Sequence, residues 1–521
     1  MKVLIFNPYS LDNNSMPVLL DEAAEYLQDP STKVLFITCT GDMKPCDINY
    51  ESSGLRCTEC RLSTRLLLNS FKAPNFNHRK LANYIDGDLR KRIARLGFSY
   101  RTIDDVKGIS HKGLNIGLGV VSSYVSMTRN LEPELLGENR RFIDGMLQSS
   151  ALLVEALTRI VDDYNPERIC VFNGRFCGLR PIFELGRARH IQTEVYECTF
   201  SGDRDLQRKV KFTNALPHDI DNNTAIIEDN WNQKAAESDR AANAALFFER
   251  RRRSEPASDK VYTAGQHDGL MPDNWDESKR NFVIFNSSED EFFCVGESFD
   301  KYKLFESQIE GIRYLLEQSV NDATIQYYLR VHPNLRGIPF RYHAGLKEIF
   351  GGYRNITVIE ANSPISTYCL IDKCEKVFVF GSTTGVEAAY WGKPVVLMGG
   401  AFYLHLDVAY YAQSLSELNE LIVKKLQPKP RLGALKYALF IFGERGERPK
   451  HLDFDYYTLS VGKKSLVIPR CYAIKGSIFP YILLLGFFRT LNLLSHIRFK
   501  RSTVPKMMVE VSKYYPGQNE V

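Results

Sequence analysis

Short apolar runs alternate with polar loops and amphipathic helical stretches, and this alternation restricts the fold more than any other feature of the chain. Strands that alternate with helices form parallel sheets, because a parallel connection requires a crossover helix. Helices are expected between the runs, for example over residues 146–163 and 305–318. The expected strands are residues 3–6, 33–38, 168–172, 193–196, 282–285, 325–331, 357–359, 376–380 and 395–398. The sequence therefore predicts an α/β protein with parallel sheets.

The alternation is interrupted in the middle of the chain. Residues 228–253 have a charged helical pattern that ends in arginines 250–253, and a stretch rich in turn-forming residues follows. We interpret the arginines as a solvated helix end, favoured by the helix dipole, over the alternative of a grip on an anionic polymer. A chain of 521 residues is long enough for several domains. The expected parts are a Rossmann-like domain over 1–227, an interdomain helix and linker over 228–275, a second Rossmann-like domain over 276–430 and a helical C-terminal extension over 431–521.

Charge and hydropathy restrict the partners. A net charge of +5 is too small to favour nucleic acid, but it suits anionic substrates or an anionic membrane surface. The N-terminal apolar run over 3–6 is too short for a signal peptide, so we expect a cytoplasmic protein with reduced cysteines. Residues 477–501 are apolar but contain Pro480 and Arg489, which favours a helix lying on the inner face of the cytoplasmic membrane or, alternatively, a buried helix.

Ligands of open parallel sheets bind beyond the carboxyl ends of the strands, so the loops there are the candidate sites. After the strand 376–380 comes Gly-Ser-Thr-Thr-Gly, which places Ser382, Thr383 and Thr384 at the start of a helix. Helix N-termini bind phosphate through unpaired N–H groups, and hydroxyls add further donors. Thr384 and Glu387 also fit a capping box, which needs no ligand. Glu387 could alternatively approach a ribose hydroxyl.

Two further loops of the same predicted sheet carry polar side chains. Pro333 ends the strand 325–331 and holds His332 at its tip, with Arg330 two residues earlier on the same face. A histidine there can donate to a phosphoryl oxygen or protonate a leaving group, or it can be a hydrogen-bonded turn residue. Ser287 and Ser288 follow the strand 282–285 as secondary anion contacts, although Ser288 with Glu291 also fits a capping box.

The strand ends of the first domain carry a different set of polar residues. Asn173 and Arg175 flank a glycine after the strand 168–172, which suits an exposed polar contact. Asp12 follows the strand 3–6 in the chain, and Glu197 follows the strand 193–196. Both carboxylates are therefore candidates for the same edge of the first sheet.

The "HP" element and the later Ser/Thr pair resemble glycosyltransferases of the GT-B type that use cytidine-activated donors, such as Kdo and sialyl transferases. The strings "FNGR", "FNSSEDEF", "RVHPN" and "STTGVEAAYWGKPVVLMGGAFY" look similar to bacterial capsule polysaccharide biosynthesis proteins. The resemblance covers about residues 1–410 and implies two Rossmann-like domains that face a cleft.

The resemblance implies roles for these residues. His332 and the Ser382–Thr384 elbow would hold the phosphate of a nucleotide-sugar donor, Glu387 would approach its nucleotide, and Asn173 and Arg175 would contact the acceptor. Such enzymes usually invert the anomeric centre with one carboxylate base, for which Asp12 and Glu197 are the candidates. Asp-x-Asp triplets, which could bind a metal ion, occur outside the expected donor domain, as at Asp86 and Asp88. A catalytic metal is therefore not predicted. Hydrogen-bond donors of the protein would instead stabilise the leaving phosphate.

Cys39, Cys46, Cys57 and Cys60 lie within 22 residues and include one C-x-x-C pair. Four thiols can bind a structural zinc ion, which would order their loop, or they can remain unliganded and reduced. A redox C-x-x-C is the remaining alternative.

The sequence thus predicts a glycosyltransferase of capsule or cell-envelope polysaccharide synthesis. Its donor would be a nucleotide-sugar, with CMP or CDP favoured, and its acceptor a polysaccharide or lipid-linked glycan. The alternatives are a UDP-sugar enzyme of the same fold, such as an epimerase, and a non-catalytic polysaccharide-binding or scaffold protein.

Overall fold

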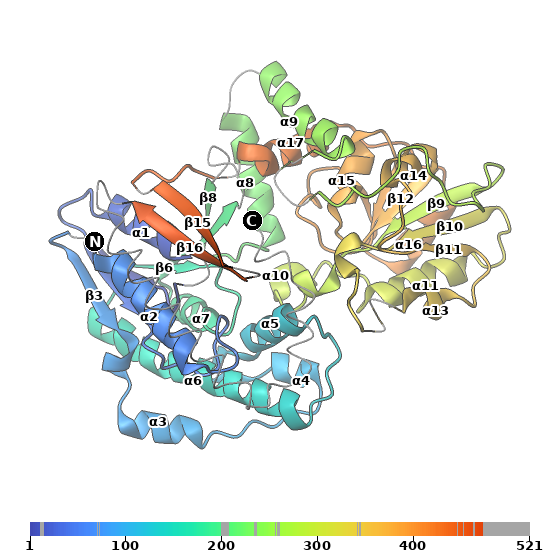
Figure 1. Cartoon of the computed structure of the whole chain (residues 1–521). Coiled ribbons are helices and arrows are strands. Elements are labelled where there is room, and N and C mark those ends of the chain that lie inside the picture. The colour runs from blue at the N-terminus through green and yellow to red at the C-terminus, as the bar shows by residue number, and fades with distance from the viewer. Residues whose placement is uncertain are drawn as a thin grey trace. The chain divides into compact units, whose positions relative to one another are not determined.

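A computed structural model describes residues 1–10, 15–69, 71, 73–199, 208–233, 237–255, 257, 261–340, 342, 345–444, 446–451, 453–461 and 464–472 (Figure 1). The chain divides into two compact units. The first unit comprises residues 1–217 and 446–521, and the second comprises residues 218–445.

The first unit contains a six-stranded sheet in the order β3-β2-β1-β6-β7-β8. Neighbouring strands are parallel, except that β8 runs antiparallel to β7. The strands are β1 (Lys2–Phe6), β2 (Lys33–Thr38), β3 (Phe76–Lys80), β6 (Arg168–Phe172), β7 (Gln192–Thr199) and β8 (Arg208–Thr213), with a small pair β4 (Ser110–His111) and β5 (Leu114–Asn115). The helices are α1 (Ser15–Tyr26), α2 (Gly54–Asn69), η1 (Leu81–Tyr84), α3 (Gly87–Ala94), α4 (Ile103–Lys107), α5 (Gly117–Thr128), α6 (Gly137–Tyr164) and α7 (Arg180–Ala188).

The second unit repeats this order in a fully parallel sheet, β11-β10-β9-β12-β13-β14. Its strands are β9 (Arg280–Phe285), β10 (Ile325–Arg330), β11 (Ile356–Ile359), β12 (Lys376–Val379), β13 (Val395–Leu397) and β14 (Tyr410–Tyr411). Its helices are α8 (Ile220–Gln233), α9 (Glu237–Arg252), η3 (Glu289–Glu291), α10 (Glu297–Asp300), α11 (Gln308–Gln318), η4 (Pro333–Leu335), α13 (Leu346–Phe350), α14 (Thr367–Lys373), α15 (Thr383–Tyr390), α16 (Leu415–Val423), α17 (Leu432–Leu439) and η5 (Phe440–Glu444).

Both sheets have the strand order 3-2-1-4-5-6 that defines a Rossmann fold. Each of the nine predicted strands is present, with ends shifted by at most three residues. The α/β class and the pair of Rossmann-like domains are therefore confirmed. The short edge strands β3, β8 and β14 were not predicted.

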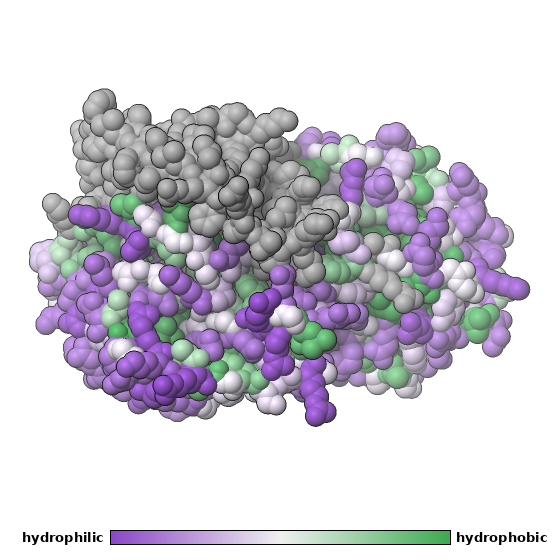
Figure 2. Space-filling model, turned by 60° about the horizontal axis from the view of Figure 1, so that its bottom comes forward, coloured by the Kyte–Doolittle hydropathy of each residue, from purple (hydrophilic) through white to green (hydrophobic). Residues whose placement is uncertain are grey.

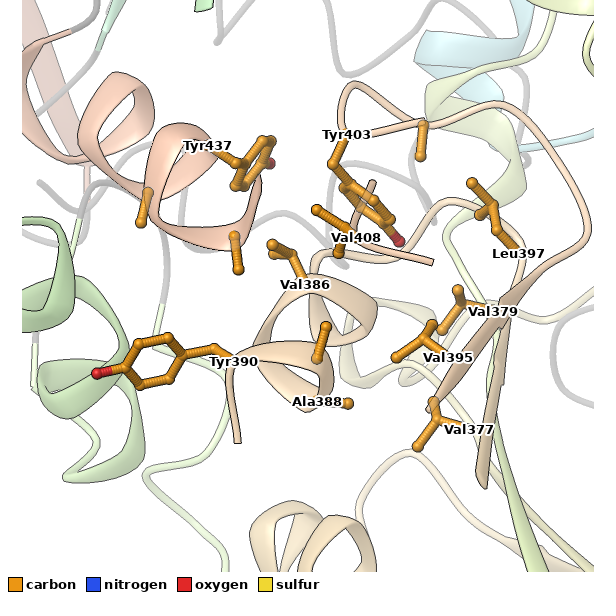
Figure 3. Close-up of a cluster of buried hydrophobic side chains, with 14 of the residues drawn as sticks. Val377, Val379, Val386, Ala388, Tyr390, Val395, Leu397, Tyr403, Val408 and Tyr437 are labelled. Atoms are coloured by element: carbon orange, nitrogen blue, oxygen red, sulfur yellow. The ribbon is translucent and has the colours of Figure 1, made fainter. Parts of the chain in front are cut away.

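Helices cover both faces of the second sheet, which is why its strands are apolar on both sides. Phe282 and Ile284 pack with α11, α13 and α16, whereas Val283 and Phe285 contact the core that contains α8, α9, α14, α15 and α17. Figure 3 shows this second core, in which valines of β12 and β13 face Val386 and Ala388 of α15. The first sheet has an equivalent core between Val3, Ile5 and the helix α1.

The observed boundaries differ from those expected from the sequence. The predicted interdomain helix and linker belong to the second unit, because Trp231 of α8 and Phe247 and Phe248 of α9 complete its core. Tyr437 of α17, in the expected C-terminal extension, also packs there. The chain then returns to the first unit, where the backbone N–H groups of Lys450 and His451 donate to Asp21.

The described part of the C-terminal extension contains the helix α17 and a hairpin of β15 (Asp453–Val461) and β16 (Lys464–Tyr472). The helical prediction is thus confirmed for α17, and the hairpin was not predicted. The membrane-surface segment 477–501 lies outside the described residues. Among the helices of the described part, none combines the length and the apolar character that crossing a bilayer requires. In Figure 2, apolar side chains on the described surface are scattered among hydrophilic ones.

Candidate functional site

A pocket lies in the second unit at the carboxyl ends of β9, β10 and β12. From β9 the sheet continues through β10 and β11 on one side and through β12, β13 and β14 on the other. The boundary between β9 and β12 is therefore the switch point at which Rossmann folds bind ligands. The space between its walls is about 650 Å³, a volume that includes open solvent. The lining residues are Arg251, Glu255, Ala257, Val261, Tyr262, Thr263, Gln266, Phe285, Asn286, Arg330, His332, Pro333, Thr367, Tyr368, Ser382, Thr383, Thr384 and Glu387.

The hydroxyl-rich elbow after β12 forms one wall of the pocket. Ser382, not Thr384, is the N-cap of α15, and its Oγ accepts from the backbone N–H of Thr384 at 3.3 Å. The alternative interpretation, a capping box of Thr384 and Glu387, is therefore wrong. Gly381 has φ +114°, and a Cβ there would lie 2.4 Å from the carbonyl oxygen of Gly400. Glycine is required at this turn because both its conformation and this close approach exclude a side chain.

His332 lies at the end of β10 and also lines the pocket. Its backbone N–H donates to Asn286 Oδ1 at 2.8 Å, and its Nδ1 accepts from the N–H of Asn334 at 3.1 Å. An imidazole whose Nδ1 accepts a hydrogen bond carries its proton on Nε2 when it is neutral. The second ring nitrogen is therefore a donor, and the edge of Tyr262 packs against the ring at 5.1 Å between centroids.

Arg330 is a buried cation in the pocket wall, with 3% of its surface exposed. Its two terminal nitrogens donate to the carbonyl oxygens of Glu360 and Ser363 at 2.8 and 3.0 Å. Its buried Nε has no hydrogen-bond partner among the described residues. Burial lowers the pKa of the guanidinium to about 10, because no carboxylate compensates the loss of water. Such a group favours an anion in the pocket.

Glu387 is buried in the same wall, at 4% exposure, and both of its oxygens are bonded. Oε1 accepts from Nε of Arg251 at 3.0 Å, and Oε2 accepts from the hydroxyl of Tyr368. Burial raises the pKa of Tyr368 well above its usual value, so this hydroxyl stays protonated. Glu387 is thus an ion-paired wall residue and not a helix cap.

Arg251 and Arg252 do not form a solvated helix end, which corrects our interpretation of the sequence for these two residues, whereas Arg253 is exposed. Arg251 pairs with Glu387, and Arg252 pairs with Asp372 and lies 4.7 Å from the ring centroid of Trp391. These two arginines therefore attach α9 to α14 and α15 within the second unit, because their charges meet carboxylates and an aromatic face there.

Ser287 and Ser288 follow Asn286 but are not among the residues that line the pocket. The Oγ of Ser287 is buried and has no hydrogen-bond partner in the described part of the chain, whereas Ser288 Oγ donates to Asp290 at 2.8 Å. The capping box of Ser288 and Glu291 does not form, because the segment makes only a short 3₁₀ turn without a side-chain cap. Their role as anion contacts stays a prediction.

Several pocket residues were not expected from the sequence. Tyr262, Thr263 and Gln266 come from the turn-rich linker, and Thr367 donates its backbone N–H to Gln266 Oε1 at 2.7 Å. The linker has no periodicity that would place it across a sheet edge. Asn286 directly follows the predicted strand 282–285, so its position at the carboxyl end of a strand could have identified it as a pocket residue.

The candidate acceptor residues lie at the carboxyl end of the first sheet. Asn173 adopts φ +59°, and its side-chain amide donates to Glu197. Arg175 is buried, and its guanidinium carbon lies 4.8 Å from the ring centroid of Phe176. Asp12, the other candidate base, lies outside the described residues. Acceptor contact and base catalysis therefore stay predictions.

Asp47 is a carboxylate at this edge that we did not anticipate. It accepts from Tyr9 Oη at 2.7 Å, Gly178 N at 2.9 Å, Cys177 Sγ at 3.1 Å and Ser123 Oγ. Burial raises the pKa of Cys177, which keeps its thiol a donor. Asp47 thus joins the loops after β1, β2 and β6.

The four cysteines of the proposed zinc site line one small cavity of the first unit. Sγ of Cys39 accepts from Gly41 N at 3.2 Å, and Sγ of Cys57 accepts from Asn49 Nδ2 at 3.1 Å. Burial raises the pKa of Cys39 and Cys46, which favours their neutral thiols. In the described part of the chain, no three His, Cys, Asp or Glu side chains are arranged to hold a metal ion. The zinc site therefore remains a prediction without support from this geometry.

Residues 298–422 match the family of capsule polysaccharide biosynthesis proteins. The matched segment contains Arg330, His332 and the Ser382–Glu387 wall of the pocket. The chain contains two Rossmann-like units, as a GT-B type fold requires, and the resemblance to capsule polysaccharide biosynthesis proteins is confirmed over the matched segment. No curated protein gives a significant match to the sequence.

Solved structures similar to this chain include two KpsC enzymes of Thermosulfurimonas dismutans. Its beta-Kdo 2,4-transferase is 12% identical, with a TM-score of 0.35, over 52% of this chain and 78% of that one. Its beta-Kdo 2,7-transferase is 15% identical, with a TM-score of 0.31, over 54% and 79%. The UDP-GlcNAc 2-epimerase of Neisseria meningitidis is 11% identical, with a TM-score of 0.21, over 85% and 99%.

Proposed function

We propose that the protein is a glycosyltransferase of capsule or surface polysaccharide synthesis, which transfers a sugar from a nucleotide-activated donor to a glycan hydroxyl. The observation that carries the proposal is the buried guanidinium of Arg330, which lies in the wall of a pocket at the switch point and whose Nε has no partner among the described residues. The family match over residues 298–422 supports the assignment to capsule synthesis.

In this proposal the pocket binds the donor through its phosphate. Arg330 and Nε2 of His332 donate from the end of β10, and the N–H groups and hydroxyls at the start of α15 donate from β12. When the bond between sugar and phosphate breaks, negative charge grows on the leaving phosphate. Donors that are already fixed around that oxygen stabilise the charge without reorganisation. His332 could also protonate the leaving group.

The acceptor would bind to the first unit, near Asn173 and Arg175. Its hydroxyl requires a carboxylate base, for which Glu197 and Asp12 are the candidates. A direct displacement with such a base inverts the anomeric centre. The configuration of the product, measured by NMR on a purified reaction, decides between inversion and retention.

The donor nucleotide is tested by thermal stabilisation of the full chain with CMP, CDP, UDP and GDP. A ligand at 100 times its dissociation constant stabilises a protein by about 2.7 kcal/mol, which raises the melting temperature measurably. We expect the largest shift with CMP or CDP. A shift with UDP alone would favour a UDP-sugar enzyme instead. No shift with any of the four contradicts the proposal and favours a polysaccharide-binding protein.

A further inference from the structure

The pocket contains an ion pair that is supplied from outside its sheet. Arg251 belongs to α9, 136 positions before Glu387 in the sequence, and its Nε donates to Glu387 Oε1 at 3.0 Å. The side chain of Arg251 is 14% exposed and that of Glu387 is 5% exposed. Tyr368 binds the other carboxylate oxygen, and all three residues line the pocket. The carboxylate is therefore held in place from two sides.

The charges of the lining residues indicate how the pair of Arg251 and Glu387 affects the net charge of the pocket. Among the described lining residues, Glu255 and Glu387 are the carboxylates, and each is paired with an arginine. Glu255 pairs with Arg253 at 2.8 Å. Arg330 lines the pocket and pairs with no carboxylate among the described residues. We therefore attribute the net positive charge of the pocket to Arg330. Without Arg251, the carboxylate of Glu387 would cancel that charge.

We propose that Arg251 is a positioning residue of the donor pocket, which neutralises Glu387 and so keeps the pocket receptive to an anionic nucleotide. This inference rests on the proposed function. A buried carboxylate close to a bound phosphate repels it strongly, because little water screens the two charges. Arg251 offsets this repulsion through its ion pair with Glu387. Helix α9 thereby becomes part of the binding site, although α9 precedes in the sequence all the strands of the sheet at whose edge the site lies.

The test measures CMP affinity of full-length variants by calorimetry. Arg251→Met removes the arginine partner of Glu387, and we expect CMP affinity to fall about tenfold or more, as in other buried charge pairs that lose one partner. The double variant Arg251→Met with Glu387→Gln carries no net charge at the pair, so affinity should return to near that of the parent. Arg251→Lys keeps a cation near Glu387 and should retain most of the affinity.

Arg252→Met is the matched control, because Arg252 neighbours Arg251 on α9 but pairs with Asp372 and does not line the pocket. Its CMP affinity should equal that of the parent. Equal affinity of Arg251→Met and the parent, or failure of Glu387→Gln to restore binding, overturns the inference. If Arg251→Met does not fold, Arg251→Gln compared with Arg251→Lys decides the same question. A parent protein that binds none of the four nucleotides overturns the proposed function itself, and this inference with it.

Discussion

The two sheets have the same strand order, but their carboxyl ends are used differently. At the first sheet, Asp47 accepts hydrogen bonds from Tyr9, Ser123, Cys177 and Gly178, so its bonding capacity is filled from within the protein. At the second sheet, the buried Nε of Arg330 has no partner among the described residues. A carboxylate whose oxygens all accept hydrogen bonds from the protein holds loops together. A buried donor without an acceptor lowers the stability of the fold unless a ligand accepts its hydrogen bond.

The net charge of the two units does not explain this difference. Counting Lys, Arg, Asp and Glu within the unit boundaries gives +10 for the first unit and −5 for the second, which together make the +5 of the chain. The pocket for an anion thus lies in the more acidic unit. Its attraction for a phosphate depends on the local arrangement of Arg330 beside paired carboxylates, and not on the overall field.

The largest effect is expected at the first sheet. Asp47→Ala leaves buried donors from Tyr9, Ser123 and Gly178 without their acceptor, and we expect a loss of about 3 kcal/mol in unfolding free energy. CMP affinity should not change, because the pocket belongs to the other unit. Urea unfolding and calorimetry measure the two quantities. Asp104→Ala is the control, since this carboxylate is 78% exposed and pairs only with the neighbouring Lys107 among the described residues. Equal losses for Asp47→Ala and Asp104→Ala would show that Asp47 does not join the loops.

Arg330→Met should give the opposite result. Removing the buried cation costs its two hydrogen bonds to carbonyl groups but also relieves the desolvation of the charge, so stability should change by less than about 1 kcal/mol. CMP affinity should fall about a hundredfold, which is about 2.7 kcal/mol. Arg280→Met removes an arginine that pairs with Glu375 at the amino end of β9, and it should leave CMP affinity unchanged. Retained CMP affinity in Arg330→Met would remove the observation on which the proposed function rests.

The sequence was sufficient to predict nine strands, although not β3, β8 and β14, and, through the predicted strands, the residues at their carboxyl ends. Apolar runs fix the strands, and the known geometry of parallel sheets then places His332 and the Ser382–Thr384 elbow at one edge. Both line the same pocket in the structure. This step works because it uses only local patterns and one topological rule.

Contacts that depend on the packing of distant segments were not predictable in this way. Glu387 fits a capping box by spacing, but Arg251 of α9 pairs with it in the folded protein. Tyr262 reaches the pocket from a linker without periodicity. The domain boundaries differ for the same reason, because α8, α9 and α17 have apolar faces whose partner the sequence does not specify.

The smallest expected effect separates a helix cap from a ligand contact. Ser382 and Ser414 both cap helices of the second unit, where their Oγ atoms accept from Thr384 N at 3.3 Å and Glu417 N at 3.2 Å. Loss of an N-cap costs about 1 kcal/mol, so Ser382→Ala and Ser414→Ala should destabilise the protein by similar amounts. Ser382→Ala should in addition weaken CMP binding about fivefold, in line with the loss of one neutral hydrogen bond, because Ser382 lines the pocket and Ser414 does not. If both variants bind CMP as the parent does, Ser382 acts only as a cap, and the anion site is reduced to Arg330, His332 and the backbone of α15.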